Sequence, residues 1–197
     1  MSAPRVIAGA FRGRSLKVPR GLVTRPTGAR VRGALFNVLG DLTGLSVLDL
    51  YAGSGALAFE ALSRGAARAV LVEHDRAALA CIRDNAAALG VEARSEIVPL
   101  ALPRALGQVT AHGPFDLVFC DPPWADLRAA TDTLAYLVRQ RALAPGARLL
   151  LEHSARDDVP RVSGLEPAER RVWGDTAVAL LVPDDRELAA EDGRTEP

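Results

Sequence analysis

The sequence predicts an α/β fold with a mostly parallel sheet of seven strands, helices on both faces and an antiparallel hairpin at its end. Two patterns predict this class. Short apolar runs alternate with segments of helical periodicity between residues 46 and 152, and two further segments that resemble strands follow at 170–173 and 176–182. Nearly continuous apolar strands separated by helices are typical of a parallel sheet that is covered on both sides.

The expected elements follow this alternation along the chain. Residues 5–18 alternate loosely between apolar and basic side chains and predict a small hairpin. Residues 29–39 place apolar side chains at helical spacing, with Arg30 and Arg32 on other faces. Parallel strands are expected at 46–51, 69–73, 96–100, 116–120 and 147–152, helices at 56–64, 75–89 and 126–140, and the hairpin at 170–173 and 176–182.

Composition indicates one ordinary globular domain. The 197 residues are 49% hydrophobic and carry 24 basic and 24 acidic side chains, enough for a core without metals or disulfides. No apolar run approaches the roughly 20 residues of a membrane helix, and no secretory signal is recognisable. Cys81 and Cys120 lack the spacing of a zinc site or a disulfide framework, and the three histidines lack ligand spacing. We therefore expect a cytoplasmic protein without a membrane segment or a metal.

The charges are distributed unevenly along the chain. Residues 1–40 hold eight basic side chains and no acidic one, whereas residues 183–197 hold six acidic side chains and two arginines. Eight cations without counter-charges attract phosphates strongly. We expect a basic extension that contacts nucleic acid at 1–40, an α/β domain at 41–182 and an acidic, disordered tail at 183–197.

A glycine-rich turn after the first strand predicts a nucleoside-cofactor site. Gly53 and Gly55 let the backbone approach a ligand closely, and the helix that follows presents unpaired N–H groups to it. Twenty residues past Gly53 the second strand ends at Glu73, whose carboxylate can accept hydrogen bonds from ribose hydroxyls. The turn also fits the dinucleotide fingerprint G-x-G-x-x-A, so a nicotinamide-dependent dehydrogenase remains an alternative. Asp49 in the string DLYAGSG resembles the first motif of S-adenosylmethionine-dependent methyltransferases.

A second motif, Asp121-Pro122-Pro123-Trp124, follows the fourth strand at the edge where open α/β sheets bind ligands. Two consecutive prolines make the turn rigid. An exocyclic amine of a nucleobase is a poor nucleophile because its lone pair is delocalised into the ring. If Asp121 and the Pro122 carbonyl each accept one of its N–H bonds, the lone pair can turn towards a methyl donor. Trp124 would stack on the target base.

The chain resembles the RsmD family of bacterial 16S ribosomal RNA guanine-N2 methyltransferases over residues 5–182. The segments that carry the resemblance are RVIAG at 5–9, RGR at 12–14, TRPT at 24–27, RVR at 30–32, LFN at 35–37, DLYAGSGAL at 49–57, EALSRGA at 60–66, Glu73, DR at 75–76, DPPW at 121–124 and VWGDT at 172–176. The resemblance implies a class I, Rossmann-like fold and methylation of guanine 966 with S-adenosylmethionine. The substrate would be the small ribosomal subunit or its assembly intermediate, and the enzyme a monomer.

The resemblance and the motifs together give three sets of candidate residues. The catalytic set is Asp121, Pro122, Pro123 and Trp124. The cofactor-binding set is Asp49, Tyr51, Ala52, Gly53, Ser54, Gly55, Glu73, His74 and Asp121. The set that contacts RNA is Arg12, Arg14, Arg25, Arg30 and Arg32. Residues 98–101 are apolar where the family often has a polar side chain, so adenine would be recognised by backbone groups.

Three other functions remain as alternatives. A DNA amino-methyltransferase would use the DPPW motif in the same way, although the chain leaves little room for a separate target-recognition domain. A non-catalytic RNA-binding ribosome-assembly factor would need the basic extension but no cofactor. A dehydrogenase would use the glycine turn but leaves the DPPW motif without a role.

Overall fold

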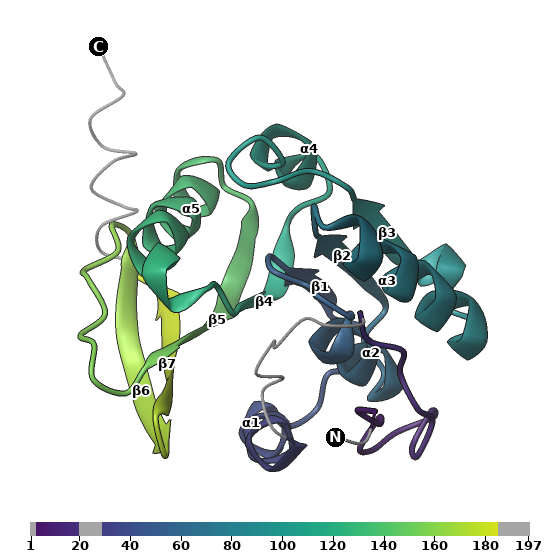
Figure 1. Ribbon diagram of the computed structural model, residues 1–197. Coiled ribbons are helices and arrows are strands. Elements are labelled where there is room, and N and C mark those ends of the chain that lie inside the picture. The colour runs from purple at the N-terminus through teal and green to yellow at the C-terminus, as the bar shows by residue number, and fades with distance from the viewer. Residues whose placement is uncertain (1–2, 20–28, 185–197) are drawn as a thin grey trace. The chain divides into compact units, whose positions relative to one another are not determined.

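The computed structural model describes residues 3–19 and 29–184 (Figure 1). It contains two compact units, one that ends at Ala105 and one that starts at Leu106. None of the described helices is long and apolar enough to cross a membrane. The two units are described separately below.

The first unit is built on three parallel strands in the order β3-β2-β1. Its elements are α1 (Ala29–Leu39), β1 (Ser46–Asp49), α2 (Ala56–Ser63), β2 (Arg68–Val72), α3 (Arg76–Leu89), the 3-10 helix η1 (Glu92–Arg94) and β3 (Ser95–Val98). All four residues of β1 are buried, as expected for a central parallel strand. The Asp75 side chain caps α3 by accepting from the Ala78 N–H, and Gly90 with φ +68° ends it.

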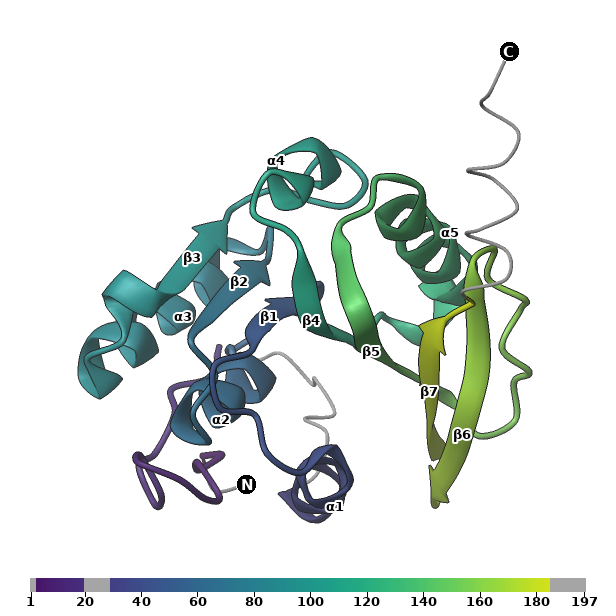
Figure 2. The ribbon, with the colours of Figure 1, turned by 180° about the vertical axis from the view of Figure 1, so that it is seen from behind.

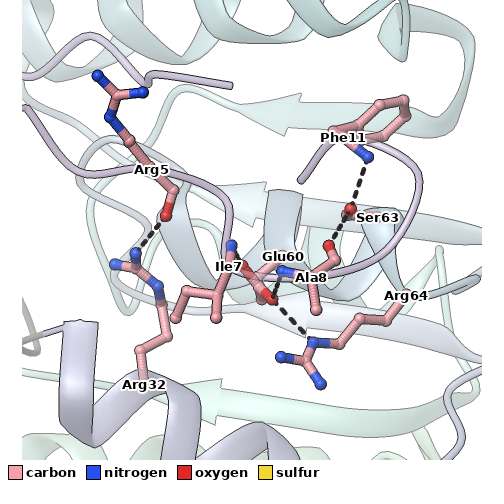
Figure 3. Close-up of polar contacts among 8 residues, drawn as sticks. All are labelled: Arg5, Ile7, Ala8, Phe11, Arg32, Glu60, Ser63 and Arg64. Atoms are coloured by element: carbon pink, nitrogen blue, oxygen red, sulfur yellow. Dashed lines mark hydrogen bonds and ion pairs between the residues drawn. The ribbon is translucent and has the colours of Figure 1, made fainter. Parts of the chain in front are cut away.

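The N-terminal segment, residues 3–19, is attached to α2 (Figure 3). Its antiparallel pairing is one bridge between Arg5 and Ser15, flanked by the bond from Val6 N–H to the Arg14 carbonyl. The predicted hairpin is therefore present as a short, irregular loop. The segment is held by the side chains of Glu60 and Ser63 on α2.

The second unit contains a mixed sheet in the order β4-β5-β7-β6. Its elements are α4 (Leu106–Thr110), β4 (Phe115–Cys120), the 3-10 helix η2 (Trp124–Asp126), α5 (Leu127–Arg139), β5 (Leu143–Ser154), β6 (Leu165–Trp173) and β7 (Thr176–Pro183). Strands β4 and β5 are parallel, whereas β7 is antiparallel to both β5 and β6. Figure 2 shows the hairpin of β6 and β7 at the edge of this sheet.

These elements confirm the predicted fold class of seven strands, parallel except in the closing hairpin. The predicted helix at 29–39 has those bounds, and the turn of the hairpin lies at Gly174. Three differences concern the second unit, where α4 was not predicted, β5 begins at Leu143 rather than Ala147, and β6 begins at Leu165 rather than Arg170. The first half of β6 was not predicted because it contains polar residues and Pro167. In an exposed edge strand, apolar and polar side chains do not alternate clearly.

Candidate active site

Glu73 fixes the glycine loop that follows β1. The Gly53 N–H donates to Glu73 Oε2 at 2.9 Å, while the backbone N–H groups of His74 and Asp75 donate to Oε1 at 2.7 and 2.8 Å. The carboxylate therefore lies at the carboxyl end of β2, next to the turn after β1. Three accepted hydrogen bonds leave about one lone-pair site, on Oε2, for a donor from a ligand. The ribose-binding role of Glu73 stays a prediction.

The two glycines of the loop face different surroundings. A Cβ atom on Gly53 would meet no heavy atom within 4 Å, whereas one on Gly55 would lie 2.4 Å from the Phe59 ring and 3.1 Å from Leu71. Both residues have positive φ, +55° and +78°, which favours glycine. Gly55 is thus required by packing inside the protein, and Gly53 leaves open space where a ligand can approach the backbone.

Asp49, the last residue of β1, is 1% exposed. Its Oδ2 accepts a weak bond from the Ala58 N–H at 3.3 Å, and its Oδ1 has no hydrogen-bond partner within the described ranges. Burial is the main reason that the pKa of Asp49 is raised to about 7, and the nearby charge of Glu73 adds to it. A buried carboxylate with an unsatisfied oxygen beside the loop fits a ligand that carries positive charge, such as S-adenosylmethionine.

The raised pKa of Asp49 predicts a pH-dependent stability. The unfolded chain releases this proton near pH 3.8 and the folded chain near pH 7, so the stabilising contribution is complete below pH 3.8 and is lost as the pH rises to 7. The loss is on the order of 4 kcal/mol. We expect Asp49→Asn to lack this component, as measured by urea unfolding of both proteins at several pH values between 4 and 8. A difference between the two that stays constant with pH would contradict the assignment.

Four further cofactor candidates lie in or next to the same loop, whereas Asp121 belongs to the second unit. Ala52 is buried and its N–H donates to the Val72 carbonyl at 3.0 Å, which joins the turn to β2. Tyr51 is half-buried. The Ser54 carbonyl accepts from Asn85 on α3 at 3.0 Å. The His74 side chain is exposed, with Nδ1 3.6 Å from Glu73 Oε1. All four belong to the first unit.

The DPPW motif forms a rigid bracket after β4 in the second unit. Asp121 is half-buried and Pro122 is buried, whereas Pro123 is exposed and Trp124 is 38% exposed. Pro123 is extended, with φ −52° and ψ 135°, and its carbonyl accepts from the Asp126 N–H at 2.7 Å to close η2. The bracket therefore holds a carboxylate and a partly exposed aromatic ring on a short turn, as the two prolines predicted.

Comparison with known proteins identifies the family. The family model described as conserved hypothetical protein 95, which is the RsmD family, matches residues 4–182. The chain belongs to the RsmD family.

Individual relatives agree with this membership. Ribosomal RNA small subunit methyltransferase D of Escherichia coli K12 is 37% identical over 159 residues, which cover 80% of this chain and 78% of the relative. The solved structure of yhhF from Escherichia coli has a TM-score of 0.80 and 33% identity, and the match covers 93% of this chain and 99% of that one.

A more distant solved structure shows the fold alone. Precorrin-6y C5,15-methyltransferase of Geobacter metallireducens has a TM-score of 0.61 at 18% identity, with 85% of this chain and 92% of that one covered. The class I methyltransferase fold that the motifs predicted is thereby confirmed for this RsmD-family chain.

The arginines predicted to contact RNA differ in their exposure to solvent in this RsmD-family chain. Arg12 and Arg14 are exposed on the N-terminal segment, and an Arg14 Nη atom donates to the Ala88 carbonyl at 2.5 Å. Arg25 and the side chain of Arg30 lie outside the described part of the chain.

Arg32 requires a correction, because it is not on a solvent-facing side of α1. It is 2% exposed and donates from Nη2 to the Arg5 carbonyl at 2.6 Å (Figure 3). Burial lowers its pKa. Arg32 therefore ties the N-terminal segment to α1, and we remove it from the set that contacts RNA.

Sequence reasoning missed the roles of two buried polar residues, Glu60 and Asn85. Glu60 is a charged residue within the otherwise apolar helix α2. Asn85 lies in the interior of α3, where asparagine is unfavourable unless its side chain forms hydrogen bonds outside the helix. Both features were visible in the sequence, although neither reveals the partner. Among the residues that the structure describes, no three His, Cys, Asp or Glu side chains are grouped as metal ligands.

Proposed function

We propose that this RsmD-family chain transfers a methyl group from S-adenosylmethionine to the N2 amine of guanine 966 in 16S rRNA. The substrate is the small ribosomal subunit or its assembly intermediate. The proposal depends most on the DPPW bracket at the end of β4, because that arrangement suits an exocyclic amine. A relative with 37% identity is named as a small subunit rRNA methyltransferase, which supports an rRNA substrate.

In the proposed reaction, residues of the first unit bind the cofactor. Glu73 accepts a hydrogen bond from the ribose through the lone-pair site that remains on Oε2, and the open side of Gly53 lets the ligand approach the loop. The positive charge of a ligand bound beside Asp49 favours the ionised form of this carboxylate, whose Oδ1 has no hydrogen-bond partner within the described residues. When bound, S-adenosylmethionine supplies a sulfonium methyl group, whose carbon–sulfur bond breaks with the electron pair remaining on sulfur.

Residues of the second unit orient the amine. Asp121 and the Pro122 carbonyl accept its two N–H bonds, so that its lone pair leaves the plane of the ring and can attack the methyl carbon. The methylated nitrogen then loses a proton, which the Asp121 carboxylate can accept and release to water. Trp124, which is partly exposed, stacks on the guanine.

The proposal is tested on small subunits from a bacterium whose own gene of this family is deleted. The purified chain and S-adenosylmethionine are added, and the RNA is analysed by nuclease digestion, mass spectrometry and primer extension. We expect one new N2-methylguanosine, at position 966. Methylated adenine N6 or cytosine N4 in a parallel DNA reaction would favour a DNA enzyme instead. RNA binding without any transfer would identify an assembly factor.

The basic N-terminal segment carries a separate prediction about RNA binding. Replacement of Arg12 and Arg14 by alanine should weaken binding and reduce the slope of log affinity against log salt by roughly 1 to 2, because fewer counterions are released. Filter binding at several salt concentrations measures this slope. Arg128→Ala with Arg139→Ala, two exposed arginines of α5, is the matched control. Equal slopes in the two variants would show that Arg12 and Arg14 do not contact phosphate.

The remaining proposals concern organisation and location. We propose that residues 1–40 contact RNA, that residues 41–182 form the methyltransferase domain, and that the enzyme works as a cytoplasmic monomer. The acidic tail proposed for 183–197 lies outside the described residues from position 185 onward.

A further inference from the structure

Asn85 is a buried polar residue in the interior of α3 that has no part in the proposed chemistry. It is 2% exposed, and its side chain makes three hydrogen bonds, all to backbone groups outside the helix. Its Oδ1 accepts from the Lys17 N–H at 2.7 Å, and its Nδ2 donates to the carbonyls of Lys17 and Ser54, each at 3.0 Å. The amide group therefore uses both of its donors and its acceptor.

These three bonds join two segments of different predicted roles. Lys17 belongs to the basic N-terminal segment, which also carries the exposed Arg12 and Arg14. Ser54 lies between Gly53 and Gly55, in the loop that Glu73 holds from its other side. Because both neighbours of Ser54 are glycines, the backbone there has unusual freedom. The hydrogen bond from the Asn85 amide restricts that freedom, and the same amide is bonded to both the N–H and the carbonyl of Lys17.

We propose that Asn85 couples RNA binding on the N-terminal segment to cofactor binding at the glycine loop. RNA that contacts the segment stabilises the position of Lys17. Because the Asn85 amide is bonded to both Lys17 and the Ser54 carbonyl, it then holds the Ser54 carbonyl more firmly. The loop is then held in the conformation that binds the cofactor, so each ligand increases the affinity for the other by the same factor. The inference rests on the proposed function, since it requires both an RNA substrate and a nucleoside cofactor.

The residue next to Asn85 provides a matched control. Asp84 also lies on α3 and also contacts Lys17, through an ion pair of 2.8 Å to the lysine Nζ. Both partners of this pair are exposed, by 66% and 54% of their side chains, so the pair contributes little stability. In contrast to Asn85, Asp84 makes no hydrogen bond to the loop within the described residues and contacts Lys17 only through its side chain. Asp84→Ala should therefore weaken the attachment slightly and leave the coupling in place.

The coupling is measured with the full chain and S-adenosylhomocysteine, which binds without reaction. Calorimetry gives its dissociation constant with and without a 16S rRNA fragment that contains position 966. For the natural sequence and for Asp84→Ala, we expect the RNA to lower this constant at least about fivefold. In Asn85→Ala and in the isosteric Asn85→Asp, which cannot donate to Ser54 when ionised, the ratio should fall to less than about twofold. Circular dichroism and thermal unfolding identify any variant that does not fold.

Two results would overturn the inference. In the first, the natural chain methylates the RNA but binds S-adenosylhomocysteine equally well with and without RNA. This result would leave the proposed function intact. The other is a folded Asn85 variant with unchanged coupling. If the natural chain methylates no RNA, the proposed function fails first and the coupling fails with it. Hydrogen exchange adds a local measurement, because the Gly55 amide should exchange faster in Asn85→Asp than in Asp84→Ala.

Discussion

Replacement of Asp121 by alanine is expected to reduce methyl transfer by about a thousandfold or more, with a much smaller effect on cofactor binding, in which Asp121 is one of nine candidate residues. The proposed role of Asp121 is to accept an N–H bond of the amine and then its proton, and no other side chain of the bracket has a carboxylate. Loss of one oriented group that stabilises charge in a transition state typically costs 10²–10³ in rate, and loss of the proton acceptor adds to it.

The measurement is single-turnover methylation of small subunits, together with calorimetry of S-adenosylhomocysteine. Asp126→Ala is the matched control, because Asp126 lies on the same turn, is exposed and is followed directly by α5. Asp121→Asn keeps the shape and one acceptor but no negative charge, so an intermediate rate is expected. Turnover near that of the natural chain in Asp121→Ala would contradict the assigned role.

Replacement of Glu60 by alanine is expected to lower the free energy of unfolding by about 3–5 kcal/mol. Glu60 is fully buried on α2, and its carboxylate accepts from the N–H groups of Ile7 and Ala8 at 2.6 and 3.1 Å and from Arg64 Nε at 2.8 Å. Removal of the carboxylate leaves two backbone donors and a guanidinium without their partner (Figure 3). The N-terminal segment should then be held on α2 only by its bonds to Ser63 and become more mobile.

Urea unfolding measures this loss, and Glu96→Ala is its control, since Glu96 is an exposed glutamate of the same unit. The control should stay within about 0.5 kcal/mol of the natural chain. RNA binding of Glu60→Ala should also weaken, because Arg12 and Arg14 would no longer be held. An unfolding free energy that equals that of the control would show that these hydrogen bonds contribute no net stability.

Much of the fold was predictable because its patterns are local. The helix at 29–39 follows from apolar spacing, and the parallel strands follow from short apolar runs between helices. The spacing between the glycine turn and the second strand end predicted a ribose-binding role for Glu73, but it did not predict that the Glu73 carboxylate accepts from the Gly53 N–H. The bracket at 121–124 was predictable because proline restricts the backbone in any context.

What the sequence could not predict depends on partners far along the chain. Arg32 was expected on a solvent-facing side of its helix, because an arginine is rarely buried, yet the Arg5 carbonyl provides a partner. The function of Asn85 needs Lys17 and Ser54, which no periodicity connects to it. Strand β6 begins earlier than its apolar residues indicate because pairing with β7 defines it, with Leu165 opposite Pro183.

The docking of the N-terminal segment on α2 also constrains how the protein forms during synthesis. The segment leaves the ribosome before α2 and can form these hydrogen bonds only after Glu60 and Ser63 have emerged, since the contacts span 52 to 55 positions. Until then the segment has only its own short loop to hold it. In nascent chains arrested before Ser63, the N-terminal segment should thus be accessible to proteases. In longer nascent chains it should be protected.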